Sequence, residues 1–172
     1  MNQKVKMKPS YLKIAFLDRD GTLIKDYPDE KWREIKEPEF LEGSIEGLKR
    51  LKEMGYDFII ITNQYLINDG IISLNDYQQF TGKFLKKLKE ENIDILKIYF
   101  CPHNEKDHCH CKKPKPGMIE QAKKDFLIDM NNSIYIGDSQ VDYLLAKHFN
   151  LTFYGINYNG DNVKSYRIIL EI

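Results

Sequence analysis

The chain has 172 residues, and its 26 Lys and Arg residues balance its 26 Asp and Glu residues, so the formal net charge is zero. This length favours one domain over 1–172 whose core needs neither disulfides nor a metal to fold. The charge balance gives no basic footprint for nucleic acid or membrane, and the charged first residues do not resemble a secretory signal. We therefore expect a cytoplasmic monomer with local recognition sites.

The first half of the chain reads as two units, each a strand followed by a helix. An apolar strand over 14–18 precedes a helix that has Ser44 as its N-cap and stops at Gly55. A second apolar strand over 57–62 precedes a helix that opens with a capping box over 73–76. This helix carries an apolar stripe that we expect in the core: Tyr77, Phe80, Phe84 and Leu88.

The second half continues the alternation. We predict strands over 95–100, 133–136 and 152–156, separated by helices over 117–126 and 140–148. The alternation predicts an α/β fold, with a Rossmann-like, doubly wound, mainly parallel sheet and helices on both faces. Ligands of such sheets bind outside the carboxyl ends of the strands.

Two acids follow the first strand, Asp18 and Asp20, and Gly21 permits a turn that brings both over one crevice. A carboxylate can attack phosphorus and form an aspartyl phosphate. A neighbouring carboxyl group can then protonate the leaving oxygen and later activate water. The pair is thus suited to phosphoryl transfer.

Carboxylates repel a phosphate unless cations lie between them. Asp138 follows the fourth predicted strand and would, with Asp18, suit octahedral Mg²⁺. Thr62 ends the second strand and offers a hydroxyl and an N–H to a phosphate oxygen, and a lysine from the segment 112–115 offers positive charge. Each motif alone is also typical of a turn or helix cap, but their combination at strand ends indicates an active site.

These motifs together resemble the haloacid dehalogenase superfamily of phosphohydrolases. Its signature is Asp-x-Asp-Gly-Thr, a strand-terminal Thr or Ser, a lysine, and Gly-Asp-x-x-x-Asp, matched here by 18–22, Thr62, a lysine near 113 and 137–142. The resemblance implies a fold with a minimal cap, because only short segments separate the motifs.

The resemblance also implies a role for each acid. Asp18 would be the nucleophile, and Asp20 the general acid/base that also binds Mg²⁺ through its carbonyl. Asp138 would bind Mg²⁺, and Asp142 would orient the lysine or the waters of the metal. We expect further residues of these motifs to contact the substrate and its phosphate: Arg19, Gly21, Thr22, Asn63 and Lys112.

A separate segment, 101–111, contains three cysteines and three histidines. In a chain without an export signal this composition favours a metal over disulfides, and a closed set of four such ligands is typical of structural Zn²⁺. We expect Cys101, Cys109 and Cys111 as ligands, with His103 as the fourth ahead of His108 or His110.

The zinc-loop pattern, followed by Lys-Pro, resembles two branches of the superfamily, the heptose 1,7-bisphosphate 7-phosphatases and the histidinol-phosphate phosphatases. The match implies Lys113 as the motif lysine, with Lys115 as the alternative. Lys112 stands where an arginine is usual and lacks its bidentate fork, which leaves the contact to a second phosphate open. The segments 62–64 and 115–118 favour the heptose branch, whereas 20–24 and the short zinc loop are closer to the histidinol branch.

The leading interpretation is a Mg²⁺-dependent phosphomonoesterase that acts on a small metabolite, most naturally the heptose 1,7-bisphosphate. Histidinol phosphate is the alternative substrate. A DNA 3′-phosphatase shares the acidic motif but is disfavoured by the zinc loop and the absence of a basic stripe. An inactive zinc-loop binding module is disfavoured because the four acids and the lysine are all present.

Overall fold

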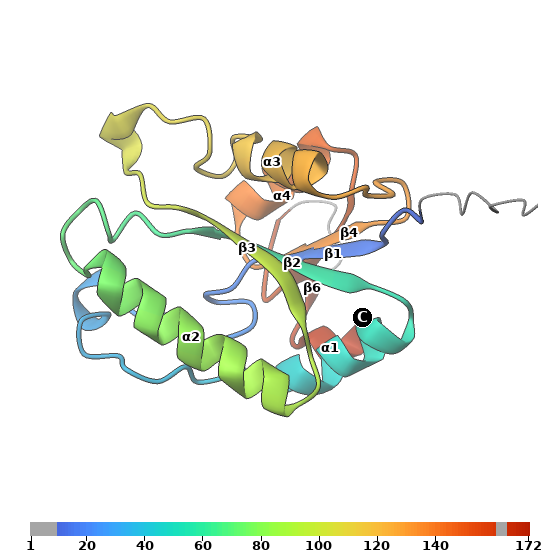
Figure 1. Ribbon diagram of the computed structural model, residues 1–172, viewed down its shortest axis with the longest axis horizontal. Coiled ribbons are helices and arrows are strands. Elements are labelled where there is room, and N and C mark those ends of the chain that lie inside the picture. The colour runs from blue at the N-terminus through green and yellow to red at the C-terminus, as the bar shows by residue number, and fades with distance from the viewer. Residues whose placement is uncertain (1–9, 161–164) are drawn as a thin grey trace, which may run out of the picture.

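The computed structural model describes residues 10–160 and 165–172. Within these ranges, six strands form one sheet in the order β3-β2-β1-β4-β5-β6, and all neighbouring strands are parallel (Figure 1). The strands are β1 (Ile14–Leu17), β2 (Asp57–Asn63), β3 (Ile95–Cys101), β4 (Ile134–Gly137), β5 (Thr152–Ile156) and β6 (Ser165–Tyr166). The predicted doubly wound parallel sheet is confirmed.

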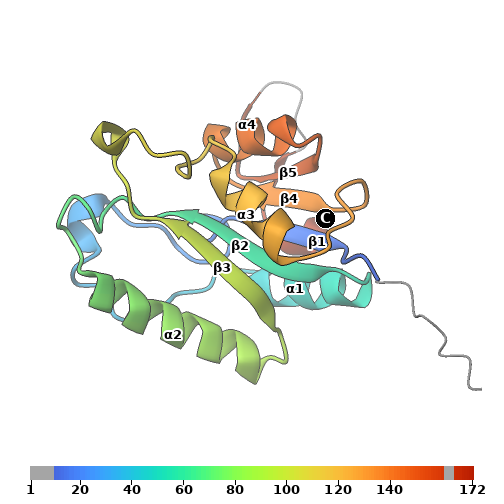
Figure 2. The same ribbon diagram turned by 45° about the horizontal axis from the view of Figure 1, so that its top comes forward.

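In the described residues, four α-helices connect the strands and cover both faces of the sheet. They are α1 (Ser44–Glu53), α2 (Leu74–Glu90), α3 (Gly117–Asp125) and α4 (Gln140–His148). Helices α1 and α2 cover one face, and α3 and α4 cover the other (Figures 1 and 2). In the described part of the chain, no helix is long and apolar enough to cross a membrane.

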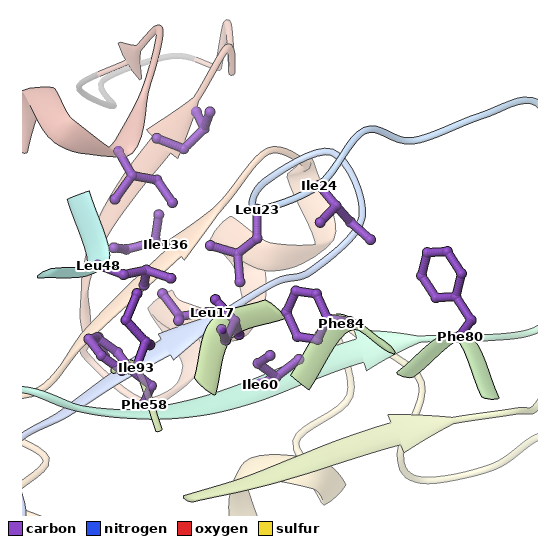
Figure 3. Close-up of a cluster of buried hydrophobic side chains, with 14 of the residues drawn as sticks. Leu17, Leu23, Ile24, Leu48, Phe58, Ile60, Phe80, Phe84, Ile93 and Ile136 are labelled. Atoms are coloured by element: carbon purple, nitrogen blue, oxygen red, sulfur yellow. The ribbon is translucent and has the colours of Figure 1, made fainter. Parts of the chain in front are cut away.

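The core consists of two clusters of buried apolar side chains, one on each face. The larger cluster joins Leu17 of β1 and Ile60 of β2 to Phe84 of α2 (Figure 3). The apolar stripe of α2 lies in this cluster as predicted, and all four of its residues are buried. The smaller cluster packs α3 and α4 on the opposite side of the same strands.

The helix termini agree with the sequence analysis at α2 but not at α1. At α2, the Ser73 hydroxyl accepts from the backbone N–H of Asp76 at 3.0 Å, and the Asp76 carboxylate accepts from that of Ser73 at 3.0 Å. At α1, the prediction of Ser44 as N-cap is wrong. Gly43 takes that place with a φ of 72°, a left-handed conformation that glycine adopts without strain, and Ser44 is buried inside the first turn.

The sheet order creates a switch point beside β1. From β1 the chain passes to β2 on one side, and it later returns to β4 on the other side. The connections on the two sides run over opposite faces of the sheet (Figure 1). At such a point a crevice is expected at the carboxyl ends of the strands, here β1 and β4. Asp18 and Asp138 both lie at this crevice.

Candidate active site

A crevice of about 220 Å³ lies at the switch point. It is lined by residues from three adjacent strands and from the segment after residues 101–111, here called the cysteine loop. Asp18 follows β1, Thr62 lies near the end of β2, and Asp138 follows β4. The lining is mostly polar: Asp18, Asp20, Asp26, Asp29, Trp32, Thr62, Asn63, Gln64, Tyr65, Leu66, Lys113, Asp138, Ser139 and Val141. The residues expected as nucleophile, acid/base, phosphate ligand and lysine are therefore brought together.

A buried lysine joins two carboxylates at the floor of the crevice. Lys113 Nζ lies 2.6 Å from Asp18 Oδ1 and 2.7 Å from Asp142 Oδ1, and it donates to the carbonyl of Ile61 at 3.0 Å. Burial alone would lower the pKa of Lys113, but the charges of Asp142 and Asp18 outweigh it and raise this pKa. The lysine is therefore cationic at neutral pH and balances charge beside Asp18.

Asp142 is fully buried and contacts the lysine directly. Its carboxylate also accepts hydrogen bonds from the hydroxyls of Tyr135, at 2.8 Å, and Ser139, at 2.5 Å. These three side chains and the backbone N–H of Ser139, which donates at 3.3 Å, thus hold Asp142 in place. Of the two functions expected for this acid, contact with the lysine is the one seen in the geometry.

Asp18, Asp138 and Asp142 form a cluster whose carboxylate oxygens lie within 4.8 Å of one another. Burial, followed by the like charge of Asp142, raises the pKa of Asp138 to about 6. Close packing of hard oxygen donors with excess negative charge fits Mg²⁺. Gly21 makes room for this arrangement, because a Cβ there would lie 2.2 Å from Asp138 Oδ2.

Asp20 faces the same crevice but is held by neighbours of its own. Arg19 donates to both of its carboxylate oxygens, from Nε at 2.8 Å and from Nη2 at 2.9 Å. Gln64 Nε2 donates to Asp20 Oδ2 at 2.6 Å and to the Thr62 hydroxyl at 2.9 Å. Gln64 had not been expected as a site residue; its place after Thr62-Asn63 was the available signal.

Three residues expected beside the phosphate make other contacts. The Arg19 side chain is buried and bonded to Asp20, so it does not reach the phosphate side. The Thr22 hydroxyl donates toward Asp18, at 3.2 Å, and Asp138, at 3.4 Å. The Asn63 amide pairs with the backbone of Lys113, accepting from its N–H at 2.9 Å. These side chains therefore hold other residues of the site in place and do not contact the phosphate, because their polar atoms already have partners in the chain.

The two other lysines of the segment point elsewhere. Lys112 Nζ lies 2.6 Å from Glu105 and 5.0 Å from the centre of the Tyr65 ring. Lys115 is exposed and donates to the carbonyl of Cys109 at 2.7 Å. Of the lysines considered, only Lys113 contacts Asp18 in the described structure.

The rim of the crevice is formed by two loops, within 25–40 and 65–73, that lie outside the sequence motifs. The Tyr65 hydroxyl donates to Asp29 at 3.0 Å, which connects the loop after β2 to the short helix η1 (Asp29–Lys31). Trp32 lines the crevice beside them, and Asp26 adds another carboxylate. No motif marks these positions, because the rim forms only when two loops distant in sequence meet.

The cysteine loop follows β3 and brings four metal-ligand side chains together. Ligand atoms of Cys101, His103, Cys109 and Cys111 lie within 4.8 Å of one another. His103 Nδ1 lies 3.2 Å from Cys111 Sγ, and the Cys101 and Cys109 sulfurs are 3.6 Å apart. His110 instead pairs with Glu120. The donor set and its spacing fit a tetrahedral metal such as Zn²⁺.

The backbone around the loop supports a thiolate. Burial raises the pKa of Cys109, but backbone N–H groups, first that of Lys112, outweigh it and lower this pKa to about 7. The Lys112 N–H donates to Cys109 Sγ at 3.3 Å. Such N–H bonds stabilise the ionised sulfur that a metal requires.

Comparison with known proteins adds independent findings. The family model described as polynucleotide kinase 3 phosphatase matches residues 13–154. The chain is 42% identical over 144 residues to the D-glycero-alpha-D-manno-heptose-1,7-bisphosphate 7-phosphatase of Photorhabdus laumondii, covering 79% of this chain and 77% of the relative. It is 41% identical over 141 residues to the D-glycero-beta-D-manno-heptose-1,7-bisphosphate 7-phosphatase of Pasteurella multocida, covering 78% and 76%.

A solved structure shares the fold. The D,D-heptose 1,7-bisphosphate phosphatase of B. bronchiseptica, crystallised with magnesium and phosphate, superposes with a TM-score of 0.81 at 22% identity. The match covers 92% of this chain and 94% of that one. The same α/β architecture therefore extends over nearly the whole length of both proteins.

Proposed function

This chain belongs to the polynucleotide kinase 3 phosphatase family within the haloacid dehalogenase phosphatases, and we propose that it removes the 7-phosphate of a heptose 1,7-bisphosphate. The observation that carries this proposal is 41–42% identity to enzymes of that name over more than three-quarters of the chain. The acidic crevice, with Asp18 beside Lys113, supports phosphoryl transfer.

In the first step, the Asp18 carboxylate attacks phosphorus and the bond from phosphorus to the ester oxygen breaks. Asp20 gives its proton to that oxygen, so the sugar leaves as an alcohol. Lys113 and the hydroxyl of Thr62 stabilise the negative charge that gathers on the phosphoryl oxygens. The products of this step are the dephosphorylated sugar and phospho-Asp18.

In the second step, the Asp20 carboxylate takes a proton from a water molecule. The water oxygen bonds to phosphorus as the bond to Asp18 breaks, which releases inorganic phosphate and restores both acids. Asp142 takes no proton in this scheme. It holds Lys113, with which it makes a 2.7 Å ion pair, beside Asp18.

Two metal sites complete the proposal. Asp18, Asp138 and the backbone carbonyl of Asp20 would hold Mg²⁺, which offsets the repulsion between phosphate and carboxylates when bound. The related B. bronchiseptica structure contains magnesium and phosphate, which supports this choice. Cys101, His103, Cys109 and Cys111 would hold a structural Zn²⁺.

The proposal is tested with a panel of phosphate esters and the variant Asp18→Asn. We expect wild-type protein with Mg²⁺ to release phosphate fastest from a heptose 1,7-bisphosphate, with the two anomers assayed separately. Asp18→Asn should lower kcat by at least ~10³-fold because the nucleophile is lost, while the circular dichroism spectrum stays unchanged. Near-normal turnover by this variant would rule out the mechanism.

Histidinol phosphate and a 3′-phosphorylated oligonucleotide belong in the same panel. The family model takes its description from a polynucleotide phosphatase, so the second substrate needs a direct test. The zero formal net charge of the chain speaks against it, because a long phosphodiester backbone is bound through an excess of basic residues. A preference for either ester over the heptose bisphosphate would reassign the substrate but retain the chemistry.

A further inference from the structure

The carboxylate of Asp20 is oriented by a buried arginine that is itself fixed to helix α2. We propose that Arg19 is a positioning residue, anchored by Thr81, that keeps Asp20 aimed at the ester oxygen during proton transfer. This inference rests on the proposed phosphatase mechanism. It assigns to Arg19 and Thr81 a function that follows from neither the acidic motif nor the metal sites.

The contacts of Arg19 leave its guanidinium little freedom. The residue is 1% exposed, and its Nε and Nη2 bind the two oxygens of Asp20 at 2.8 and 2.9 Å. Its Nη1 donates to the Thr81 hydroxyl at 3.2 Å. A bidentate pair fixes the plane of the carboxylate as well as its distance, which a single donor does not.

Helix α2 provides the anchor. Tyr77, Phe80 and Thr81 lie at i, i+3 and i+4 and therefore share one face of the helix. The Arg19 guanidinium carbon lies 5.5 Å from the Tyr77 ring centre and 5.3 Å from that of Phe80, distances at which arginine and aromatic rings attract. The orientation of Asp20 is thus coupled to a rigid helix outside the crevice.

A lysine cannot replace Arg19 in these contacts. A lysine at position 19 would supply one compact ammonium in place of the planar fork, so it could not bind both Asp20 oxygens and Thr81 at once. Gln64 would still hold one oxygen of Asp20, at 2.6 Å. In such a variant the lysine would still balance the charge of Asp20, and Gln64 would still donate one hydrogen bond to it. The plane of the Asp20 carboxylate would no longer be fixed.

The effect of a misplaced Asp20 on the rate of phosphoryl transfer depends on the leaving group of the ester. When phosphorus is transferred to Asp18, an alkyl oxygen departs as a strongly basic alkoxide unless Asp20 protonates it. A p-nitrophenolate is a weak base and departs without that proton. Misplacement of Asp20 should therefore slow attack on alkyl esters more than on p-nitrophenyl phosphate, whereas general damage to the site would slow both alike.

The test compares kcat/KM for p-nitrobenzyl phosphate and p-nitrophenyl phosphate, two esters of similar size, in the Mg²⁺-loaded protein. We expect Arg19→Lys to lower the benzyl-to-phenyl ratio by about 10-fold or more, since general acid catalysis contributes ~10²–10⁴-fold. Thr81→Val removes only the hydroxyl that anchors Nη1 and should lower the ratio by about 2- to 5-fold. Thr81→Ser retains that hydroxyl and should retain the ratio.

Arg50→Lys is the matched control, because this arginine of α1 donates to the carbonyl of Leu170 away from the crevice. If Arg19→Lys fails to fold, Thr81→Val decides the question. An active wild type with an unchanged ratio in the folded variants overturns this inference alone. A wild type that hydrolyses neither ester and also releases no phosphate from a heptose 1,7-bisphosphate overturns the proposed function and this inference with it.

Discussion

Lys113 is a buried cation that joins two carboxylates from distant parts of the chain. It is 4% exposed and contacts two carboxylates that are themselves buried, Asp18 and Asp142. Two like charges this close and this far from water require a cation between them. The lysine is thus needed to form the site before any substrate binds.

Replacing Lys113 by Met should therefore affect stability and activity together. We expect the free energy of unfolding to fall by ~3–5 kcal/mol, because a buried ion pair loses one partner, and phosphatase activity to disappear. Chemical denaturation and a p-nitrophenyl phosphate assay measure the two effects.

Lys115→Met is the matched control for this prediction, since Lys115 is exposed and donates only to the carbonyl of Cys109. It should leave activity and unfolding nearly unchanged. If Lys115→Met and not Lys113→Met abolished activity, the motif lysine would have been assigned to the wrong position.

At the scale of secondary structure, helix α1 makes a close contact with the end of the chain. Gly47 faces the short helix η3 (Ile169–Glu171), where a Cβ would lie 2.6 Å from Ile169 Cγ2 and 2.8 Å from the backbone of Ile169. The closest atoms include main chain, which moves less readily than a side chain. Glycine at this position lets the C-terminal segment pack onto the helix.

A pair of glycine substitutions tests this contact. Gly47→Ala should lower the free energy of unfolding by ~1–3 kcal/mol through overpacking, even though alanine is the better helix former. Gly82→Ala in α2 should raise it by ~0.5–1 kcal/mol, because a Cβ there meets no described heavy atom within 4 Å. Equal gains at both positions, measured by urea denaturation, would show that η3 does not pack tightly on α1.

Across the whole molecule, the cysteine loop connects the sheet to the buried Lys113. The loop begins at Cys101, the last residue of β3, and Lys113 stands two residues after its last cysteine, Cys111. A metal held by both ends of the loop would fix the path of the chain that leads to Lys113. We therefore expect metal binding in the loop to be coupled to activity, although the two proposed sites share no ligand.

Removal of zinc should consequently reduce both stability and turnover. With a zinc-selective chelator in excess Mg²⁺, we expect a lower Tm and a lower kcat, because the unbound thiols no longer close the loop. Restoring Zn²⁺ should recover both values, and Cys109→Ser should reproduce the loss. A zinc-free protein with unchanged Tm and kcat would contradict the structural site.

The sequence alone determined the architecture and the set of candidate residues. The apolar side chains of a helix recur every three or four residues, so the apolar stripe of α2 could be predicted from the sequence. The capping box at Ser73 is likewise a pattern of neighbouring residues. Parallel strands place their carboxyl ends at one edge, so Asp18 and Asp138 could be assigned to a common crevice. Two-residue β6 has no such period and was not predicted.

Only the tertiary structure decided what each polar side chain contacts. It placed Lys113 rather than Lys115 against Asp18, a contact between residues 95 positions apart, and it turned Arg19 toward α2 and away from the phosphate side. The Tyr65–Asp29 contact at the rim likewise joins two loops. The physical reason is that residue type and period are local properties, whereas a polar contact depends on which distant segments packing brings together.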